Sequence, residues 1–379
     1  MRYRRGRRLG AALLLLVTLA ACDGSAEDGG PTPSERPPAT GRVETRHDFS
    51  VRPLLSQHTP YGLGPIALQG DEVAVPAGAD GDWDRVAVLG PGAKPLRIVA
   101  HSQFARGLIN WVAVSGDWVA WVDQSHAQSD SDPDVLWRIR AIDLRTHEKR
   151  LLASNGHAAD PFVPQVQGAP AGLFWTQAEQ DRMARERFWV PGARAPTDLV
   201  RHAEMTPGSE TFADGAVVFL GPSALPHHGH TTGGDCWRVS LADHEVQPLT
   251  RTGLAMGCAA AGDAVTWTQH LDPDARSLPA DGVLDDPYEV LVRPLAGGPS
   301  RLLHRGYLAM GYPRSGATFT AWPTVRGSLM VRSLTGAAHL VVPRSAGGGT
   351  FFRAGGESLA FVRSRSAGDV LSVVRVRSR

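Results

Sequence analysis

One short phrase recurs along the chain and constrains the fold more than any other feature of the sequence. In its clearest form, at residues 116–122, it reads GDWVAWV, a glycine-containing pair followed by a mostly apolar run. Glycine provides the positive φ that a two-residue hairpin turn requires, and the run after it has the composition of a buried strand. The last large residues of the seven copies are Val75, Trp121, Trp175, Phe219, Trp267, Trp322 and Phe361.

The copies follow one another at intervals of 39 to 55 residues. A period in the forties with strand-like units is typical of β-propellers, whereas helical repeats would show apolar stripes with a period of 3.6. Each phrase follows a short apolar segment and precedes two further strand-like segments. The third segments include 136–142, 236–241 and 290–295, and the fourth include 96–99, 149–152, 247–250 and 301–304. We therefore predict an all-β fold, a seven-bladed β-propeller of four-stranded antiparallel blades.

In this fold the phrase becomes the second strand of each blade. Neighbouring sheets pack face to face about 10 Å apart, so each sheet must present bulky apolar residues to the next. Trp121 and its equivalents are predicted to fill these interfaces as core residues. The alternative is a ladder of aromatic side chains that stacks on carbohydrate.

Ring closure is predicted to involve the N-terminal segment. Three strands are expected in the last blade, near 350–353, 358–363 and 369–376. Residues 43–54 are predicted to add the fourth strand by pairing with residues 370–376, because a closed ring has no open sheet edge to invite aggregation. The arrangement resembles the TolB-like and WD-repeat-like propellers, although the spaced Gly-His and Trp-Asp signature of WD repeats is absent.

The N-terminus has the layout of a secretion signal. Residues 1–21 contain a basic start, a short apolar core and small residues directly before Cys22. The apolar core is too short to span a bilayer. The stretch Leu19-Ala20-Ala21-Cys22 resembles the lipobox of bacterial lipoproteins. That resemblance implies cleavage before Cys22, acylation of this residue with chains such as palmitate, and anchoring on the extracytoplasmic side of the cell membrane. An ordinary signal peptide followed by a chance cysteine is the alternative.

The rest of the chain divides into two parts. Residues 22–42 are rich in Pro, Gly and polar residues and are predicted to form a disordered tether, while residues 43–379 form the propeller. Lys and Arg total 39 against 38 for Asp and Glu, so no field of one sign favours nucleic acid as a partner. We expect a monomer without a nucleic-acid partner or a cofactor.

The candidate metal ligands are His227, His228 and His230, with Asp235 as a further carboxylate ligand. Three imidazoles within four residues can share one metal ion, but a solvated loop with chance histidines is the alternative. This segment and two acidic ones, 130–134 and 272–286, all follow second strands. A propeller therefore places the three segments on one face, and loops on a rigid scaffold are where binding sites gather.

The remaining cysteines, Cys236 and Cys258, are predicted to form a disulfide. They belong to strands that start from the same face in consecutive blades, and an extracytoplasmic compartment permits oxidation. Two separate buried thiols are the alternative.

The sequence favours a lipid-anchored binding module for a protein or a cell-envelope glycan, with the ligand on the face that carries the long loops. The alternative is a propeller enzyme, a metal-dependent polysaccharide lyase or hydrolase that uses the segment from His227 to His230. A fold of this kind hosts both classes, so the fold alone does not decide.

Substitution of Cys22 by Ser tests the membrane anchor. Removing the acylated thiol should release the protein into the soluble extracytoplasmic fraction, because stable anchoring requires the acyl chains. Detergent-phase partitioning measures the effect. Partitioning of Cys22→Ser at the level of the parent would contradict the prediction.

Overall fold

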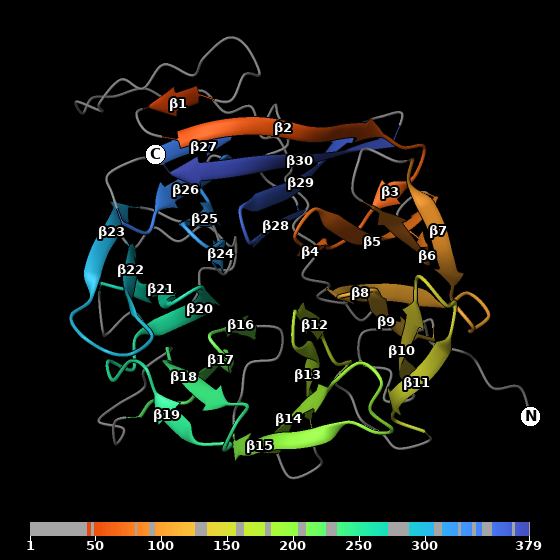
Figure 1. The fold of residues 1–379 in the computed structure, drawn as a ribbon, viewed down its shortest axis with the longest axis horizontal. Coiled ribbons are helices and arrows are strands. Elements are labelled where there is room, and N and C mark those ends of the chain that lie inside the picture. The colour runs from red at the N-terminus through yellow and green to blue at the C-terminus, as the bar shows by residue number, and fades with distance from the viewer. Residues whose placement is uncertain are drawn as a thin grey trace, which may run out of the picture.

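The computed structural model is a ring of seven antiparallel β-sheets around a central axis (Figure 1). It describes residues 44–46, 49–79, 82–90, 95–125, 135–156, 163–178, 183–203, 210–224, 233–271, 288–306, 313–324, 327–335, 339–342, 351–365 and 368–378. Within these ranges the regular elements are all strands, and no helix has the length and apolarity needed to cross a membrane. The predicted seven-bladed β-propeller is confirmed.

Each sheet is one blade, and its strands run outward from the axis in sequence order, apart from those contributed by the N-terminal segment. Blade 1 contains β3 (Gly62–Leu63), β4 (Ala67–Gln69), β5 (Glu72–Ala79), β6 (Asp82–Leu89) and β7 (Arg97–His101). Blade 2 contains β8 (Leu108–Ser115), β9 (Trp118–Gln124), β10 (Trp137–Asp143) and β11 (Lys149–Ser154). Blade 3 contains β12 (Val166–Ala169), β13 (Gly172–Ala178), β14 (Met183–Trp189) and β15 (Thr197–Ala203).

The other four blades complete the ring. Blade 4 contains β16 (Thr211–Ala213), β17 (Ala216–Gly221), β18 (Asp235–Ser240) and β19 (Val246–Pro248). Blade 5 contains β20 (Ala255–Ala261), β21 (Ala264–His270), β22 (Tyr288–Pro294) and β23 (Arg301–Gly306). Blade 6 contains β24 (Arg314–Ser315), β25 (Phe319–Pro323), β26 (Leu329–Ser333), β27 (His339–Val342) and, outermost, β1 (Glu44–Arg46). Blade 7 contains β28 (Phe351–Gly355), β29 (Ser358–Arg365), β30 (Gly368–Ser378) and, outermost, β2 (Phe49–His58).

The repeated phrase forms the second strand of every blade, as predicted. Its large residue is buried in each case and packs against the preceding blade. Trp121 of blade 2 lies in one cluster with Val86 and Val88 of blade 1, and Phe219 of blade 4 lies with Phe174 of blade 3. The interfaces between blades, which we call seams, are therefore the hydrophobic core of the molecule.

The two faces of the ring differ because successive strands alternate in direction. We call the loop face the one at which the innermost strands begin and the second strands end. On the opposite face, the turn face, short turns join first and second strands. Gly116 and Gly215 have φ values of 55° and 68°, and a Cβ added to either would meet nothing within 4 Å. The turn conformation, rather than lack of space, requires glycine at these positions.

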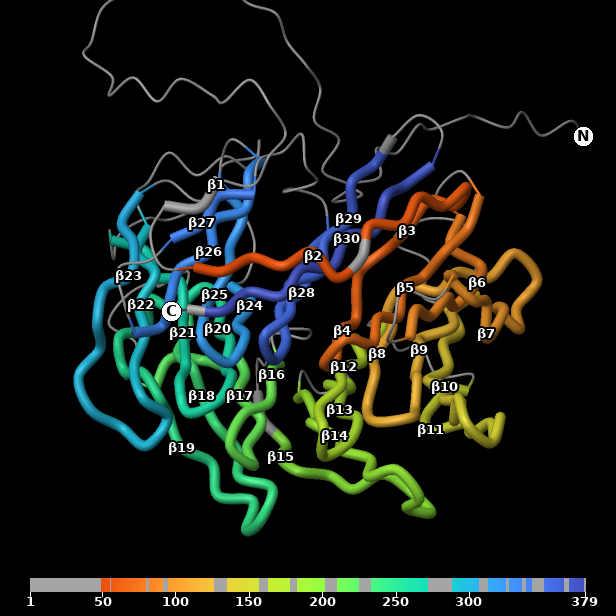
Figure 2. The backbone as a smooth tube through the Cα atoms, turned by 45° about the horizontal axis from the view of Figure 1, so that its top comes forward, coloured from red at the N-terminus to blue at the C-terminus, as the bar shows by residue number. Residues whose placement is uncertain are grey.

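Closure of the ring follows the predicted scheme. β2 pairs along β30, from Phe49 opposite Ser378 to His58 opposite Val370, and the two strands lie side by side in Figure 2. Phe49 is buried in the seam between blades 6 and 7. The N-terminal segment thus provides both a strand and a core side chain to the last blade.

The strand β1 corrects the predicted scheme, in which residues 43–54 all belonged to the last blade. Glu44 lies opposite Val341 and Arg46 opposite His339, so β1 covers the outer edge of blade 6. A three-residue polar segment has no alternating pattern by which to recognise a strand. Because β27 runs toward the loop face and β1 is antiparallel to it, the chain enters the propeller at the rim of the loop face.

One predicted strand is shorter than expected. β19 ends at Pro248, whereas the sequence analysis extended the strand to Thr250. The amides of Leu249 and Thr250 both donate to the carbonyl of Cys236, and these bonds turn the chain toward blade 5.

Nested N-terminal deletions test the closure. Removal of residues 23–47 deletes the tether and β1, while removal of residues 23–58 also deletes β2. The longer deletion should lower the melting temperature by about 5 °C or more, because it exposes the edge of β30 and removes buried Phe49. The shorter deletion should have a much smaller effect. Circular dichroism melting measures both, and equal melting temperatures for the two deletions would contradict the role of β2.

Candidate functional site

The loop face carries the longest connections of the ring. Second and third strands are joined by residues 125–136 in blade 2, 222–234 in blade 4 and 271–287 in blade 5. In the same blades, two residues each join the first and second strands on the turn face. This asymmetry makes the loop face the place to look for a site.

Several residues singled out in the sequence lie outside the described ranges. These are the lipidation candidate Cys22 with the predicted tether, the metal candidates His227, His228 and His230, and the acidic segments 130–134 and 272–286. The described residues contain no group of three or more His, Cys, Asp or Glu side chains placed to hold a metal ion. The metal hypothesis for the histidine segment stays a prediction.

Asp235 is described, and its carboxylate is occupied by protein donors. Oδ1 accepts hydrogen bonds from the Thr250 hydroxyl at 2.6 Å and from the amide of Thr252 at 2.9 Å. Oδ2 accepts one from the amide of Ala224 at 2.8 Å, and the amide of Gly253 contacts both oxygens. Asp235 therefore links Ala224, near the start of the connection that contains the three histidines, to Thr252 and Gly253 in the connection between blades 4 and 5.

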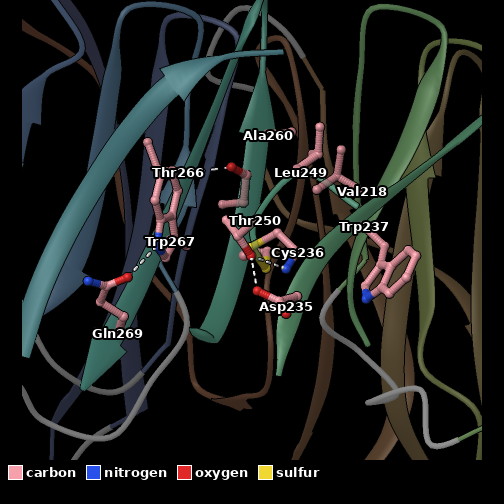
Figure 3. Close-up of a disulfide and its surroundings, with 12 residues drawn as sticks. Val218, Asp235, Cys236, Trp237, Leu249, Thr250, Ala260, Thr266, Trp267 and Gln269 are labelled. Atoms are coloured by element: carbon pink, nitrogen blue, oxygen red, sulfur yellow. Dashed lines mark hydrogen bonds between the residues drawn. A yellow bond between two sulfur atoms is a disulfide. The ribbon is translucent and has the colours of Figure 1, made fainter. Parts of the chain in front are cut away.

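A disulfide joins Cys236 and Cys258 next to this aspartate (Figure 3). It links β18 of blade 4 to β20 of blade 5, with a Cα–Cα distance of 5.9 Å, and both cysteines are fully buried. The Thr250 hydroxyl accepts from the amide of Cys236 at 2.8 Å while it donates to Asp235. Closing a loop with a sequence separation of 22 stabilises the fold by about 3 kcal/mol in the chain-entropy model. The bridge predicted from the sequence thus lies within the seam between blades 4 and 5.

Two more buried aspartates hold connections between blades in the same way. Asp123 accepts from the Ser102 hydroxyl at 2.5 Å and from the amide of Gln103 at 3.0 Å. Asp369 accepts from the amide of Leu63 at 2.7 Å. Each carboxylate satisfies backbone or hydroxyl donors of the chain that crosses from one blade to the next. These buried acids are structural.

The seam between blades 3 and 4 departs from that pattern. Here Glu186 of β14 and Glu210, which precedes β16, are both fully buried and are linked through the hydroxyl of Thr176. That hydroxyl lies 2.8 Å from Oε2 of Glu186 and also contacts Oε1 of Glu210. A hydroxyl has one proton to donate, so one of the two carboxyl groups must supply the other. Two buried carboxyl groups share one proton here.

Glu186 is the member of this pair with a raised pKa. Burial raises the pKa of Glu186 well above its ordinary value, the negative charge of Glu210 raises it further, and the Thr176 hydrogen bond opposes both effects. Protonation of this pair is therefore favoured compared with two separate, exposed carboxyl groups.

The charges of Glu210 and Arg314 both act on Arg353, which contacts Gln167, and we call these four residues the axial cluster. Arg353 of β28 donates from Nη2 to Oε1 of Gln167 on β12 at 2.5 Å. These strands belong to blades 7 and 3, so the hydrogen bond reaches across the centre of the ring (Figure 1). Burial and the charge of Arg314 lower the pKa of Arg353 to about 9, and Glu210 acts in the opposite direction. Arg353 therefore stays cationic at neutral pH.

The sequence analysis overlooked Glu186, although a pattern in the sequence could have revealed it. The strand Met183–Trp189 reads MARERFW, and the charged residues suggest an exposed strand. Counted in steps of two, Ala184, Glu186 and Phe188 share one face, and all three are buried. A glutamate between two apolar residues of one strand face was the available indication.

Comparisons with known proteins support the β-propeller fold and do not establish a function. No protein-family model matches the chain, and no curated protein matches it in sequence. The β-propeller domain of the trilobed protease from Pyrococcus furiosus is 9% identical, with a TM-score of 0.56 over 84% of this chain and 97% of that one. That domain has an open velcro topology, whereas here β2 closes blade 7.

Two further propellers are similar in structure. Oligogalacturonate lyase in complex with manganese is 11% identical, with a TM-score of 0.56 over 89% of this chain and 96% of that one. TolB from Acinetobacter baumannii is 12% identical, with a TM-score of 0.42 over 68% of this chain, which spans 59% of TolB. Identities this low establish the fold alone.

The shared proton predicts a pH dependence of stability. A buried carboxyl group with a raised pKa favours folding while it is protonated, and this advantage is lost as the pH rises from the ordinary value of 4.5 toward the folded-state value. Glu186→Gln keeps the shape of the protonated acid and removes the titration. The melting temperature of Glu186→Gln should therefore rise relative to the parent between pH 5 and pH 8.

Asp243→Asn is the control, because hydrogen bonds from the Ser240 hydroxyl and from the amide of Glu245 lower the pKa of this exposed residue below 3.8. Its effect should be the same at pH 5 and pH 8. If the difference between Glu186→Gln and the parent does not change with pH, Glu186 is not the protonated group.

Proposed function

We propose that the protein is a lipid-anchored, extracytoplasmic binding module that engages a protein or a cell-envelope glycan with its loop face. The observation that carries the proposal is the asymmetry of the ring. In blades 2, 4 and 5 the second and third strands are joined at one face of a rigid scaffold by residues 125–136, 222–234 and 271–287, while no connection of these blades on the other face is longer than six residues. Recognition is typically built on loops that a rigid frame positions.

The polar groups of the described residues support binding at this face. Glu210 and Arg314 lie at the start of innermost strands, which begin at the loop face. The side chains of Arg314 and Arg353 are partly exposed although their strands surround the axis. Arg314 and Arg353 therefore provide partly exposed polar residues at the centre of the ring, in contrast to the apolar seams around it, whereas Glu210 is fully buried.

The point where the chain enters the ring fits a membrane tether. β1 begins at the rim of the loop face, and residues 22–43 precede it. A tether of this length would span about 25 Å on average if it is disordered as the sequence predicts. A chain acylated at Cys22 would keep its loop face within the cell envelope and close to the membrane, where envelope ligands are available.

Capture from solubilised membranes and cell-wall fractions tests this function. The bait is the chain with Cys22→Ser, which keeps all described strands. A variant with residues 272–286 replaced by a Gly-Ser linker alters the loop face, and Asp117→Ala with Arg145→Ala alters the turn face as the matched control. A specific ligand should be retained by the bait and the control and lost from the loop-face variant.

Equal capture by the loop-face variant and the control would place the binding surface elsewhere and contradict the proposal. Protease treatment of the captured fraction distinguishes a protein from a glycan. A captured polysaccharide that is shortened on incubation with the bait would instead support the lyase or hydrolase alternative.

A further inference from the structure

A pocket opens on the turn face, at the seam between blades 2 and 3, and we call it the seam pocket. Its volume is about 400 Å³, within the range of about 300–1,000 Å³ that is typical of ligand sites. Two turns of blade 2 and two turns of blade 3 surround it. The seam pocket therefore lies on the opposite face of the ring from the long connections.

Hydrogen bonds hold the walls of the seam pocket in place. The amide of Leu144 donates to the carbonyl of Asp117 at 2.8 Å and joins the two turns of blade 2. The indole of Trp189 donates to the carbonyl of Ala193 at 3.0 Å, and Nη1 of Arg150 donates to the same carbonyl at 3.1 Å. Blade 2 is thus tied to the segment that follows β14. The walls are therefore in place before a ligand arrives, as in most ligand sites.

One part of the lining is apolar and suits an aliphatic chain. Val190 is 48% exposed, and Pro170 and Pro191 line the pocket together with it. The ring of Trp118 also lines the pocket and packs edge to face against Trp189, with 5.0 Å between the ring centroids. A ligand that covers Val190 removes apolar surface from water, which favours binding.

A buried hydroxyl group borders the pocket without a partner. Ser115 is 1% exposed, and its Oγ has no hydrogen-bond partner among the described residues. Ala113 lies on the same face of β8 and packs in the seam between blades 2 and 3, so the side chain of Ser115 points toward this seam as well. Buried polar atoms are normally hydrogen-bonded, and a ligand with a donor group would satisfy this oxygen.

The polar part of the lining carries two carboxylates and one guanidinium. The side chains of Asp117 and Arg145 are 3.7 Å apart and are 65% and 76% exposed, so their ion pair is weak and is easily exchanged for another. Asp143 accepts hydrogen bonds from the amides of Thr146 at 3.0 Å and Arg145 at 2.8 Å, and these bonds hold its pKa below the ordinary value of 3.8. Asp143 is therefore anionic at neutral pH. The residues that line the pocket thus carry one more negative than positive charge and favour a cation.

We propose that the seam pocket binds a basic side chain of a polypeptide partner, with its cationic head on Asp117 and its aliphatic stem on Val190. Lys and Arg side chains combine a charged head with an apolar stem, which matches the two parts of the lining. The head displaces Arg145 from Asp117 and donates to the hydroxyl oxygen of Ser115. Because Val190 and Arg145 are exposed, a side chain that projects from another protein can enter from the surface. This site is independent of the ligand proposed for the loop face.

An NMR titration tests the site with the full chain carrying Cys22→Ser and isotope-labelled tryptophan. The indole signal of Trp118 reports on the pocket and is identified by its loss in Trp118→Phe. The probes are acetyl-lysine-amide and acetyl-arginine-amide, and acetyl-norleucine-amide is the control that keeps the aliphatic stem without the charge. At least one basic probe should shift the Trp118 signal saturably. The norleucine control should bind about fivefold or more weakly, as expected for loss of an exposed charge pair.

Two variants should change the affinity for the basic probe in opposite directions. Asp117→Asn removes the charge that holds the cation and should weaken binding about threefold or more. Arg145→Gln removes the competing cation and should strengthen binding by a similar factor, which a variant that merely disturbs the fold would not do. Asp263→Asn is the matched control, because Asp263 has the same place in the Gly-Asp turn of blade 5 and its carbonyl accepts from the amide of Leu295. It should bind like the parent.

Each outcome supports or overturns the seam pocket. No saturable shift with either basic probe, equal binding of the norleucine control, or unchanged affinity in Asp117→Asn overturns the site. Cadaverine carries an ammonium group on an aliphatic chain without a peptide backbone, and tighter binding of cadaverine than of both basic probes contradicts a polypeptide partner. In the capture experiment, a protein that is retained by the loop-face variant and lost from the variant with Asp117→Ala and Arg145→Ala would support the site.

Discussion

The packing of each blade against the preceding one is the interaction on which the whole structure depends. A four-stranded sheet with two apolar faces is not stable on its own in water. Here the second strand of each blade buries its large residue against the preceding blade. Full burial of a side chain such as Phe219 stabilises the fold by about 1.5–3 kcal/mol. The benefit is complete only when the ring is closed, because an open ring would leave two apolar sheet faces in water. The pairing of β2 with β30 therefore matters to all seven seams, and not to blade 7 alone.

Apolar seams also determine where polar groups can be placed. A buried carboxylate must find donors, and Asp123 and Asp235 find them in the connections between blades, while Asp369 finds one in the first strand of blade 1. The hydrogen bonds replace the water that each buried carboxylate has lost, and they hold the donor segments in place. The seam between blades 3 and 4 solves the same problem differently, since Glu186 and Glu210 share a proton through Thr176. Departures from a structural rule that a protein otherwise follows are where functional groups are expected, and this departure is adjacent to the axial cluster.

The sequence predicts what local patterns encode. Gly116 indicates a turn, and Trp121 indicates a buried position in a strand. Because this phrase occurs seven times, it predicts the ring and the order of its strands. The disulfide was also predictable, because the blade order brings Cys236 and Cys258 to one seam. The axial cluster could not be predicted from the sequence. Arg353 and Gln167 are 186 residues apart and meet only when the seven blades have closed into a ring. Likewise, Asp235 can be recognised in sequence as a candidate ligand, but its hydrogen bonds to the connection after blade 4 depend on the folded chain.

The charge at the ring axis is set by groups in two different environments. Arg314 and Arg353 are partly exposed on innermost strands, while the glutamates beside them lie inside a seam. Burial acts against ionisation of Glu186, and the neighbouring negative charge of Glu210 strengthens that effect. The same apolar packing that holds the blades together therefore also sets the ionisation of the carboxyl groups that lie inside a seam.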